Sequence, residues 1–177
     1  MYSTPSRSRR SGAITVQIDC PGPVGDRVRP DSPIIVETAN PRDITVCLRL
    51  LRQAHGPDLS GDSEQILLQL IQDQRSNLYV GWLDTEAVGV AMVHRRISLE
   101  YRGVVWEVEG LVVDENFRQL GFGRAMIEQI LADARRGVCR ALLVPCDETN
   151  RLGRLFLNRL QFVNTGRAIY RTFADED

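Results

Sequence analysis

The chain has 177 residues, of which 43% are hydrophobic and 25% are charged, and its formal net charge is −1. This length and composition predict one globular domain with a single hydrophobic core. The near-zero charge gives no electrostatic support for binding nucleic acid or an anionic membrane, and no apolar run approaches the roughly 20 residues of a membrane-spanning helix.

The cysteines show no metal-ligand pattern. The four of them form no CxxC pair and do not cluster along the chain with the two histidines. We therefore expect no metal site, and reduced thiols in a cytoplasmic protein. Cys146 follows a predicted strand and is interpreted as a buried structural thiol.

Residues 1–32 differ in composition from the remainder and are interpreted as a flexible N-terminal extension. They are rich in proline, glycine, serine and arginine, and the first ten carry three arginines and no acid. That composition is similar to an organelle transit sequence, but we favour a solvated tail. Ile14, Val16 and Ile18 alternate, which is typical either of one extra strand or of an apolar patch in the tail. The compact domain is expected to span 33–177.

The first part of this domain predicts a strand, two helices and three further strands. The apolar run at 34–37 is typical of a strand, and Asn40-Pro41 opens a helix that Gly56-Pro57 ends. A second helix begins near Asp62, because apolar residues follow it at helical spacing. The three strands are expected over 78–83, 87–97 and 104–113.

The second part predicts two helices alternating with two strands. One helix ends at Gly137, and a buried strand follows over 141–144. Another helix carries an apolar stripe, and a last strand covers 168–173. The stripe consists of Leu152, Leu155, Phe156 and Leu160. A strand–helix–strand unit implies a parallel pair, so we expect a single α/β (α+β) domain with a mixed central sheet.

The strongest functional signal lies where the strand 104–113 leads into the next helix. Arg118-Gln119-Leu120-Gly121-Phe122-Gly123 places two glycines where the backbone can approach a ligand closely. The N–H groups and the dipole at the start of the helix suit a phosphate or pyrophosphate. A P-loop sequence is absent, and Met126 stands at the third glycine position of a dinucleotide fingerprint. The alternative is a tight turn without a ligand.

With the apolar strand before it, this segment resembles the R/Q-x-x-G-x-G/A motif of the GNAT superfamily of acetyl-CoA-dependent N-acetyltransferases. Asn150 and the later Leu160-Gln161-Phe162 are similar to the family's N-x-x-A…Y-x-x-x-G-F segment. The order of elements over 33–177 also fits the family. The resemblance implies a mixed sheet that splays open at the cofactor site, flanked by about four helices.

The resemblance also assigns residues to acetyl-CoA, the expected co-substrate, and implies no metal. The backbone of Val113 would pair with pantetheine, the Leu111 N–H would face the thioester carbonyl, and the loop N–H groups would hold the pyrophosphate. Asn150 would line the cofactor arm. The implied cofactor-binding residues are Leu111, Val112, Val113, Arg118, Gln119, Leu120, Gly121, Phe122, Gly123, Arg124, Asn150 and Leu157.

Glu107 and Glu109 stand two apart on a predicted strand, so both side chains point to one face. A substrate ammonium must lose a proton before it attacks, and the tetrahedral intermediate needs a donor for its oxyanion. Similar glutamates occur in members of the family. We assign Glu109, then Glu107, as the base and the Leu111 N–H as the oxyanion donor. The alternative is a solvated strand face with two acids that take no part. His94, on the preceding strand, could reach the acceptor site, but we interpret it as a partly exposed strand residue.

One position departs from the family pattern. The tyrosine that many members use as general acid falls on Leu157, and the usual glycine before Phe162 is Gln161. Leu157 lies off the apolar stripe, so its side chain is expected to point toward the cofactor, but it cannot donate a proton. The thiolate then leaves unassisted or takes a proton from another group, such as Tyr170 or Tyr101.

The resulting hypothesis is an N-acetyltransferase that moves an acetyl group from acetyl-CoA to a small cationic primary amine by direct attack in a ternary complex. The alternative is an acyl-CoA-binding module with weak or no turnover that acts as a sensor or regulator. The sequence leaves open the identity of the amine, the acyl-chain length and the oligomeric state, monomer or homodimer.

Overall fold

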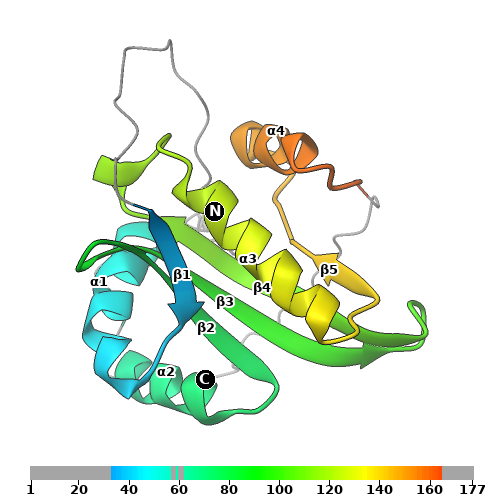
Figure 1. Ribbon diagram of the computed structural model, residues 1–177, viewed down its shortest axis with the longest axis horizontal. Helices are drawn as coiled ribbons and strands as arrows, with labels where there is room; N and C mark the ends of the chain where they lie inside the picture. The colour runs from blue at the N-terminus through cyan, green and yellow to red at the C-terminus, as the bar shows by residue number, and fades with distance from the viewer. Residues whose placement is uncertain (1–32, 57–58, 60–61, 165–177) are drawn as a thin grey trace, which may run out of the picture.

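The computed structural model describes residues 33–56, 59 and 62–164. In these residues a five-stranded sheet, in the order β1-β2-β3-β4-β5, packs α1 and α2 on one face and α3 on the other (Figure 1). No helix in this part of the chain is long and apolar enough to cross a membrane. The elements are β1 (Ile34–Thr38), η1 (Pro41–Asp43), α1 (Ile44–His55), α2 (Ser63–Gln72), β2 (Ser76–Leu83), β3 (Glu86–Ser98), β4 (Gly103–Val113), η2 (Glu115–Phe117), α3 (Phe122–Arg136), β5 (Ala141–Leu143) and α4 (Arg151–Arg159).

The order of elements agrees with the sequence prediction from the first strand through α4. Strands β1 to β4 are antiparallel neighbours and β5 runs parallel to β4, so the predicted mixed sheet with four helices is confirmed. Asn40 and Asp43 form a capping box, and the chain therefore makes the short 3-10 turn η1 before α1 begins. The predicted strand at 168–173 and the alternating run at 14–18 lie outside the described residues.

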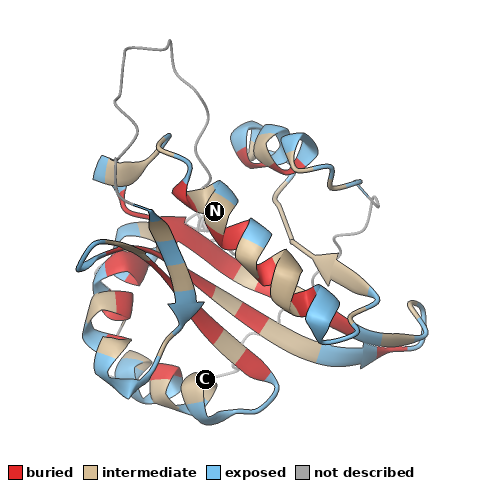
Figure 2. Ribbon diagram, viewed as in Figure 1, coloured by how far each residue is buried: buried red, intermediate tan, exposed pale blue. Residues whose placement is uncertain are grey.

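The two faces of the sheet bury separate groups of apolar side chains. Figure 2 shows the buried stretches of the strands and of the helices that pack on them in red. Alternation along the strands divides the residues between the faces. Tyr79 and Val108 pack in the cluster with α3, whereas Val80 and Val112 pack in the cluster with α1 and α2. The sheet is thus a layer between two helical layers, and only its ends and edges are available for a site.

A bulge interrupts the pairing of β3 with β4 near the middle of the sheet. Val93 pairs with Val108 and Met92 with Gly110, so Glu109 has no partner of its own on β3. Such a bulge bends the strand and changes which face the following side chains point to. Val108 and Leu111, three positions apart, consequently both pack in the cluster with α3.

The buried face of α4 differs from the predicted stripe. Leu152 and Leu155 are 50% and 51% exposed, whereas Leu157 is only 7% exposed. The face that packs on the protein consists of Gly153, Phe156, Leu157 and Leu160, which follow the i, i+3, i+4, i+7 spacing of a helix. The prediction failed because it did not count Gly153 as an inward position. A Cβ there would lie 3.0 Å from Cys146 Sγ, so the glycine lets α4 approach closely.

Gln161 occupies a backbone position that favours glycine. The N–H of Phe162 bonds to the Leu157 carbonyl and the N–H of Gln161 to the Asn158 carbonyl, both at 3.0 Å. These two bonds form a Schellman motif, in which the residue after the helix takes positive φ. Gln161 has φ 64°. The departure from the family's glycine is therefore accommodated without loss of the motif.

The corrected face of α4 gives the first testable prediction. Leu157→Ala should lower the free energy of unfolding by about 2–5 kcal/mol, because it removes buried methyl groups from the cluster with α3. Leu155→Ala, two residues away on the same helix and half exposed, should change it by less than about 0.5 kcal/mol. Urea denaturation of the two variants measures both values. Equal losses would show that the buried face is assigned incorrectly.

Candidate functional site

The C-terminal half of β4 extends beyond the end of its pairing with β5. The two strands pair at only three positions of β4, Val105 to Glu107. From Val108 to Val113 the pairing with β3 continues on the other side, and no strand within the described residues runs along the β5 side. Backbone N–H and C=O groups that point to that side can hydrogen-bond an extended ligand that carries amide groups.

The N-cap residue of α3 is Gly121, which has no side chain to cap the first turn. Gly121 has φ 97°, in the left-handed region that favours glycine, and a Cβ there would meet nothing within 4 Å. The first helical bond joins the Ala125 N–H to the Gly121 carbonyl at 2.9 Å. The N–H groups of Phe122, Gly123 and Arg124 therefore have no acceptor within the helix, and they polarise this end positively.

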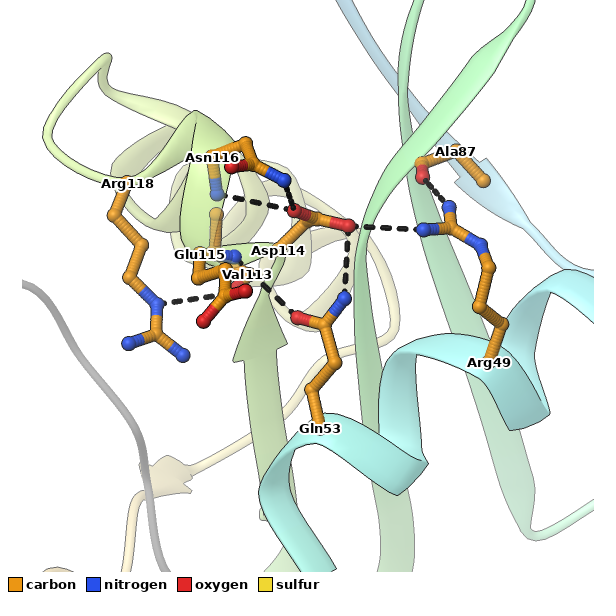
Figure 3. Close-up of polar contacts among 8 residues, drawn as sticks. All are labelled: Arg49, Gln53, Ala87, Val113, Asp114, Glu115, Asn116 and Arg118. Carbon is orange, nitrogen blue, oxygen red and sulfur yellow. Dashed lines mark hydrogen bonds and ion pairs between the residues drawn. The ribbon is translucent and has the colours of Figure 1, made fainter. Parts of the chain in front are cut away.

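The segment Arg118–Gly123, called the glycine loop below, is held in place by side chains that pack into the protein. Phe122 is buried and meets Phe117 edge to face, with ring centroids 6.0 Å apart, and Leu120 packs against the same cluster. Arg118 Nε donates to the Val113 carbonyl at 3.2 Å, which links the loop to the end of β4 (Figure 3). Because the side chains of Leu120 and Phe122 pack in this cluster, only the backbone of these two residues is left to contact a ligand.

Asp114, directly after β4, ties the loop to α1 and β3 (Figure 3). Its Oδ2 accepts hydrogen bonds from Arg49 Nη1 and Gln53 Nε2, both at 2.9 Å, and its Oδ1 accepts one from the Asn116 N–H at 3.0 Å. Arg49 Nη2 also donates to the Ala87 carbonyl at 2.6 Å. Sequence reasoning missed this cluster because Arg49 and Asp114 are 65 positions apart.

The carboxylate of Asp114 stays charged although it is almost fully buried. Burial raises its pKa, but hydrogen bonds from Gln53, the Asn116 N–H and Arg49, together with the charge of Arg49, bring the net pKa below the usual 3.8. The ionised form is therefore the form that the fold stabilises. Through these contacts, Asp114 holds the end of β4, and the segment that leads to the glycine loop, against α1.

The two glutamates of β4 lie on the same face as charged residues of β3. His94 Nε2 contacts Glu109 Oε2, and Arg96 Nε lies 3.2 Å from Glu107 Oε2. All four side chains are partly exposed. The sequence predicted a partly exposed His94, which the structure confirms, and offered a place at the acceptor site only as the alternative. The strand register, which pairs His94 with Glu107, is the signal that could have placed it there.

Asn150 has a structural role in this fold. Its Oδ1 accepts a hydrogen bond from the Gly153 N–H at 2.8 Å and so caps α4. Nearby, Asp147 Oδ1 accepts from the hydroxyl and N–H of Thr149, and these bonds lower the pKa of Asp147. Burial raises the pKa of Cys146, which favours an inert thiol at neutral pH.

Asp114→Asn should lower the free energy of unfolding by about 1–3 kcal/mol at neutral pH, because an amide cannot match the charge of Arg49. Folding lowers the pKa of Asp114, so its contribution is complete above ~pH 5 and is lost as the pH falls through the folded-state pKa. Urea denaturation of both proteins should therefore show a smaller difference at ~pH 3. Glu115→Gln, at the exposed neighbouring position, is the control. A difference that does not depend on pH would contradict the assignment.

Several solved structures share this fold at low sequence identity. The aminoglycoside acetyltransferase meta-AAC0020 from an uncultured soil metagenomic sample, solved with sisomicin, is 14% identical with a TM-score of 0.72, covering 81% of this chain and 97% of that one. Aminoglycoside 6'-N-acetyltransferase AAC(6')-Ih from Acinetobacter baumannii is 18% identical with a TM-score of 0.70, covering 81% and 100%. A transcriptional regulator from Bacillus halodurans C-125 is 17% identical with a TM-score of 0.71, covering 80% and 100%.

These structures show only the fold, whereas a match by sequence shows the family. No curated protein sequence matches the chain significantly. The sequence model of the acetyltransferase (GNAT) family, however, matches residues 45–162, which is more than half of the 177 residues. The matched range contains β4, the glycine loop and α4. The chain therefore belongs to the GNAT acetyltransferase family.

Proposed function

We propose that the protein transfers an acetyl group from acetyl-CoA to a small cationic primary amine by direct attack within a ternary complex. The observation that carries the proposal is that the edge of β4 beyond Glu107 meets the start of α3. A Cβ on Gly123, in the first turn of α3, would lie 3.7 Å from the side chain of Val113 at the end of β4. An extended amide chain along β4 and a pyrophosphate at α3 can therefore belong to one ligand.

The residues at this junction fit CoA in chemical type. The N–H groups from Gln119 to Arg124 and the positive end of α3 suit the pyrophosphate. Backbone groups from Leu111 to Val113 suit the amides of pantetheine, and Leu157 packs in the same cluster as Leu111. When bound, acetyl-CoA supplies the acetyl group as an activated thioester.

The chemistry of the chain's own residues follows from this arrangement. We assign Glu109 to accept a proton from the substrate ammonium, and the Leu111 N–H to donate to the oxyanion of the tetrahedral intermediate. Glu109 is preferred over Glu107 because it lies closer along the strand to Leu111, the proposed oxyanion donor, with only Gly110 between them. Glu109 also stands at the bulge, where it has no partner of its own on β3.

The charge of the acceptor is inferred from acids near the edge of β4. Glu107 and Glu109 lie on the sheet, and Asp147 and Glu148 follow β5, the neighbouring strand. Negative charge near the site favours a cationic amine. Two structural neighbours are aminoglycoside acetyltransferases, which supports the same class of acceptor.

One observation favours a second candidate, an acyl-CoA-binding protein with weak or no turnover. Leu157 stands at the family's usual tyrosine position and is buried among apolar side chains. It offers no proton to a leaving thiolate. A thiolate of pKa roughly 8.5, by comparison with cysteine, can leave without that proton, and we therefore retain the enzyme as the first candidate.

The assignment of the glycine loop is tested by two substitutions of equal size. Gly123→Asp should weaken CoA binding by about tenfold or more relative to Gly123→Asn, because it adds negative charge beside the pyrophosphate. Both side chains begin with the same Cβ, which would lie 3.6 Å from Phe156, an ordinary contact distance. Isothermal titration calorimetry with CoA measures the two affinities. Equal binding by both variants would remove the loop from the cofactor site.

Turnover is tested by the release of CoA thiol from acetyl-CoA across a panel of amines. Polyamines and aminoglycosides should be better acceptors than aspartate or glutamate. With the best acceptor, Glu109→Gln should lower kcat by about 100- to 10,000-fold, and the loss should shrink at high pH, where more of the amine is already neutral. Glu107→Gln is the matched variant and should cost less.

Each outcome of this assay separates the candidates. CoA binding without thiol release on any amine favours the binding protein. Wild-type kcat and pH dependence in both glutamine variants would show that the carboxylates take no part in proton transfer. A preference for acidic amines would contradict the proposed class of acceptor.

A further inference from the structure

We propose that His94, held by Ser76 and Asp73, is a positioning residue that orients the carboxylate of Glu109 toward the substrate amine; this inference rests on the proposed function. The four residues come from three strands and the turn before them, yet they form one continuous chain of polar contacts. Neither Asp73 nor Ser76 stood out in the sequence as part of the site.

The contacts run in order from solvent to the glutamate. Ser76 Oγ lies 2.9 Å from Asp73 Oδ2 and 2.9 Å from His94 Nδ1. His94 Nε2 then contacts Glu109 Oε2. Ser76 is 5% exposed, whereas the side chains of His94 and Glu109 are 34% and 40% exposed. The buried serine thus fixes one side of the imidazole, and its other side meets the carboxylate.

The direction of each hydrogen bond follows from counting protons. The Arg75 N–H and the Ser76 hydroxyl both bond to Asp73 and lower its pKa, so this carboxylate is ionised. Ser76 must then donate its single proton to Asp73, and its oxygen accepts from His94 Nδ1–H. With Nδ1 as the donor, Nε2 and the Glu109 carboxylate can be bonded only if they share one further proton.

The position of that shared proton decides whether Glu109 can act as a base. On His94 Nε2 it leaves an imidazolium beside an ionised carboxylate, and the negative charge of Asp73 favours this arrangement. Glu109 Oε2 is then engaged with His94, and Oε1 is the oxygen that meets the amine. One N–H bond of the substrate ammonium breaks as an O–H bond forms at Oε1. Glu109, which is partly exposed, afterwards releases the proton to water.

Other charged groups lie on the elements around His94 and Glu109. Asp73 and Arg75 approach from the turn between α2 and β2, Arg96 lies on β3, and Glu107 lies on β4. Arg96 pairs with Glu107, so the charges of these two largely offset one another. Asp73 is the remaining acid, and it is linked to His94 by hydrogen bonds through Ser76.

Kinetics of four variants test the role of His94 in turnover. His94→Gln should lower kcat by about tenfold or more and move the acid limb of the pH profile, with CoA affinity unchanged. Ser76→Ala should shift the same limb by a smaller amount. In the double variant with Glu109→Gln, loss of His94 should cost nothing further, because residues that act as a unit are not additive. Ser98→Ala, another buried serine of the sheet, is the control and should leave the profile unchanged.

A spectroscopic test does not depend on turnover. The chain has only two histidines, so ¹⁵N NMR of the His55→Gln protein reports the ring of His94 alone. We expect Nδ1 to carry a proton, and this signal should change in Ser76→Ala. A neutral ring with bare Nδ1 would overturn the proposal, as would wild-type kcat in His94→Gln or additive losses with Glu109→Gln. Absence of thiol release in the wild type would instead count against the proposed function, while the NMR result still decides the state of His94.

Discussion

The candidate site depends on the point at which β4 and β5 stop pairing. A parallel strand normally satisfies the backbone of its neighbour along its whole length, but here the pairing stops after Glu107. β4 stays rigid beyond that point because β3 holds its other edge and apolar side chains pack on both of its faces. The Asp114 cluster then fixes the end of the strand against α1. A rigid strand with one open edge, connected by a short loop to the start of a helix, suits an extended ligand that carries phosphate groups.

The same strand carries the charged groups that the reaction needs. The bulge gives Glu109 a position outside the regular pairing with β3, one residue before the strand resumes its register. The two glutamates have different partners on β3, because His94 contacts Glu109 whereas Arg96 contacts Glu107. In the proposed mechanism, neighbouring residues of one strand therefore serve both cofactor binding and proton transfer.

Some of the fold and of the site could be predicted because their signals are local. Alternation and helical spacing predicted the order of elements, and the motif that contains Gly121 and Gly123 indicated the family, which is now shown. The apolar face of α4 could not be read correctly, because Gly153 faces inward without an apolar side chain to mark it. The bulge was equally hidden, since it depends on how β3 pairs with β4. Arg49, Ser76 and His94 reach their partners only through that pairing and through helix packing, so distance along the sequence concealed them.

The central claim is that CoA lies along the open edge of β4 and against the first turn of α3. Hydrogen–deuterium exchange with and without CoA tests it most directly, because the ligand would cover particular backbone N–H groups. The account predicts that CoA slows exchange in β4 from Val108 to Val113 and in Phe122, Gly123 and Arg124, and leaves β1 and β2 unchanged. Protection confined to other elements, or none at saturating CoA, would contradict it.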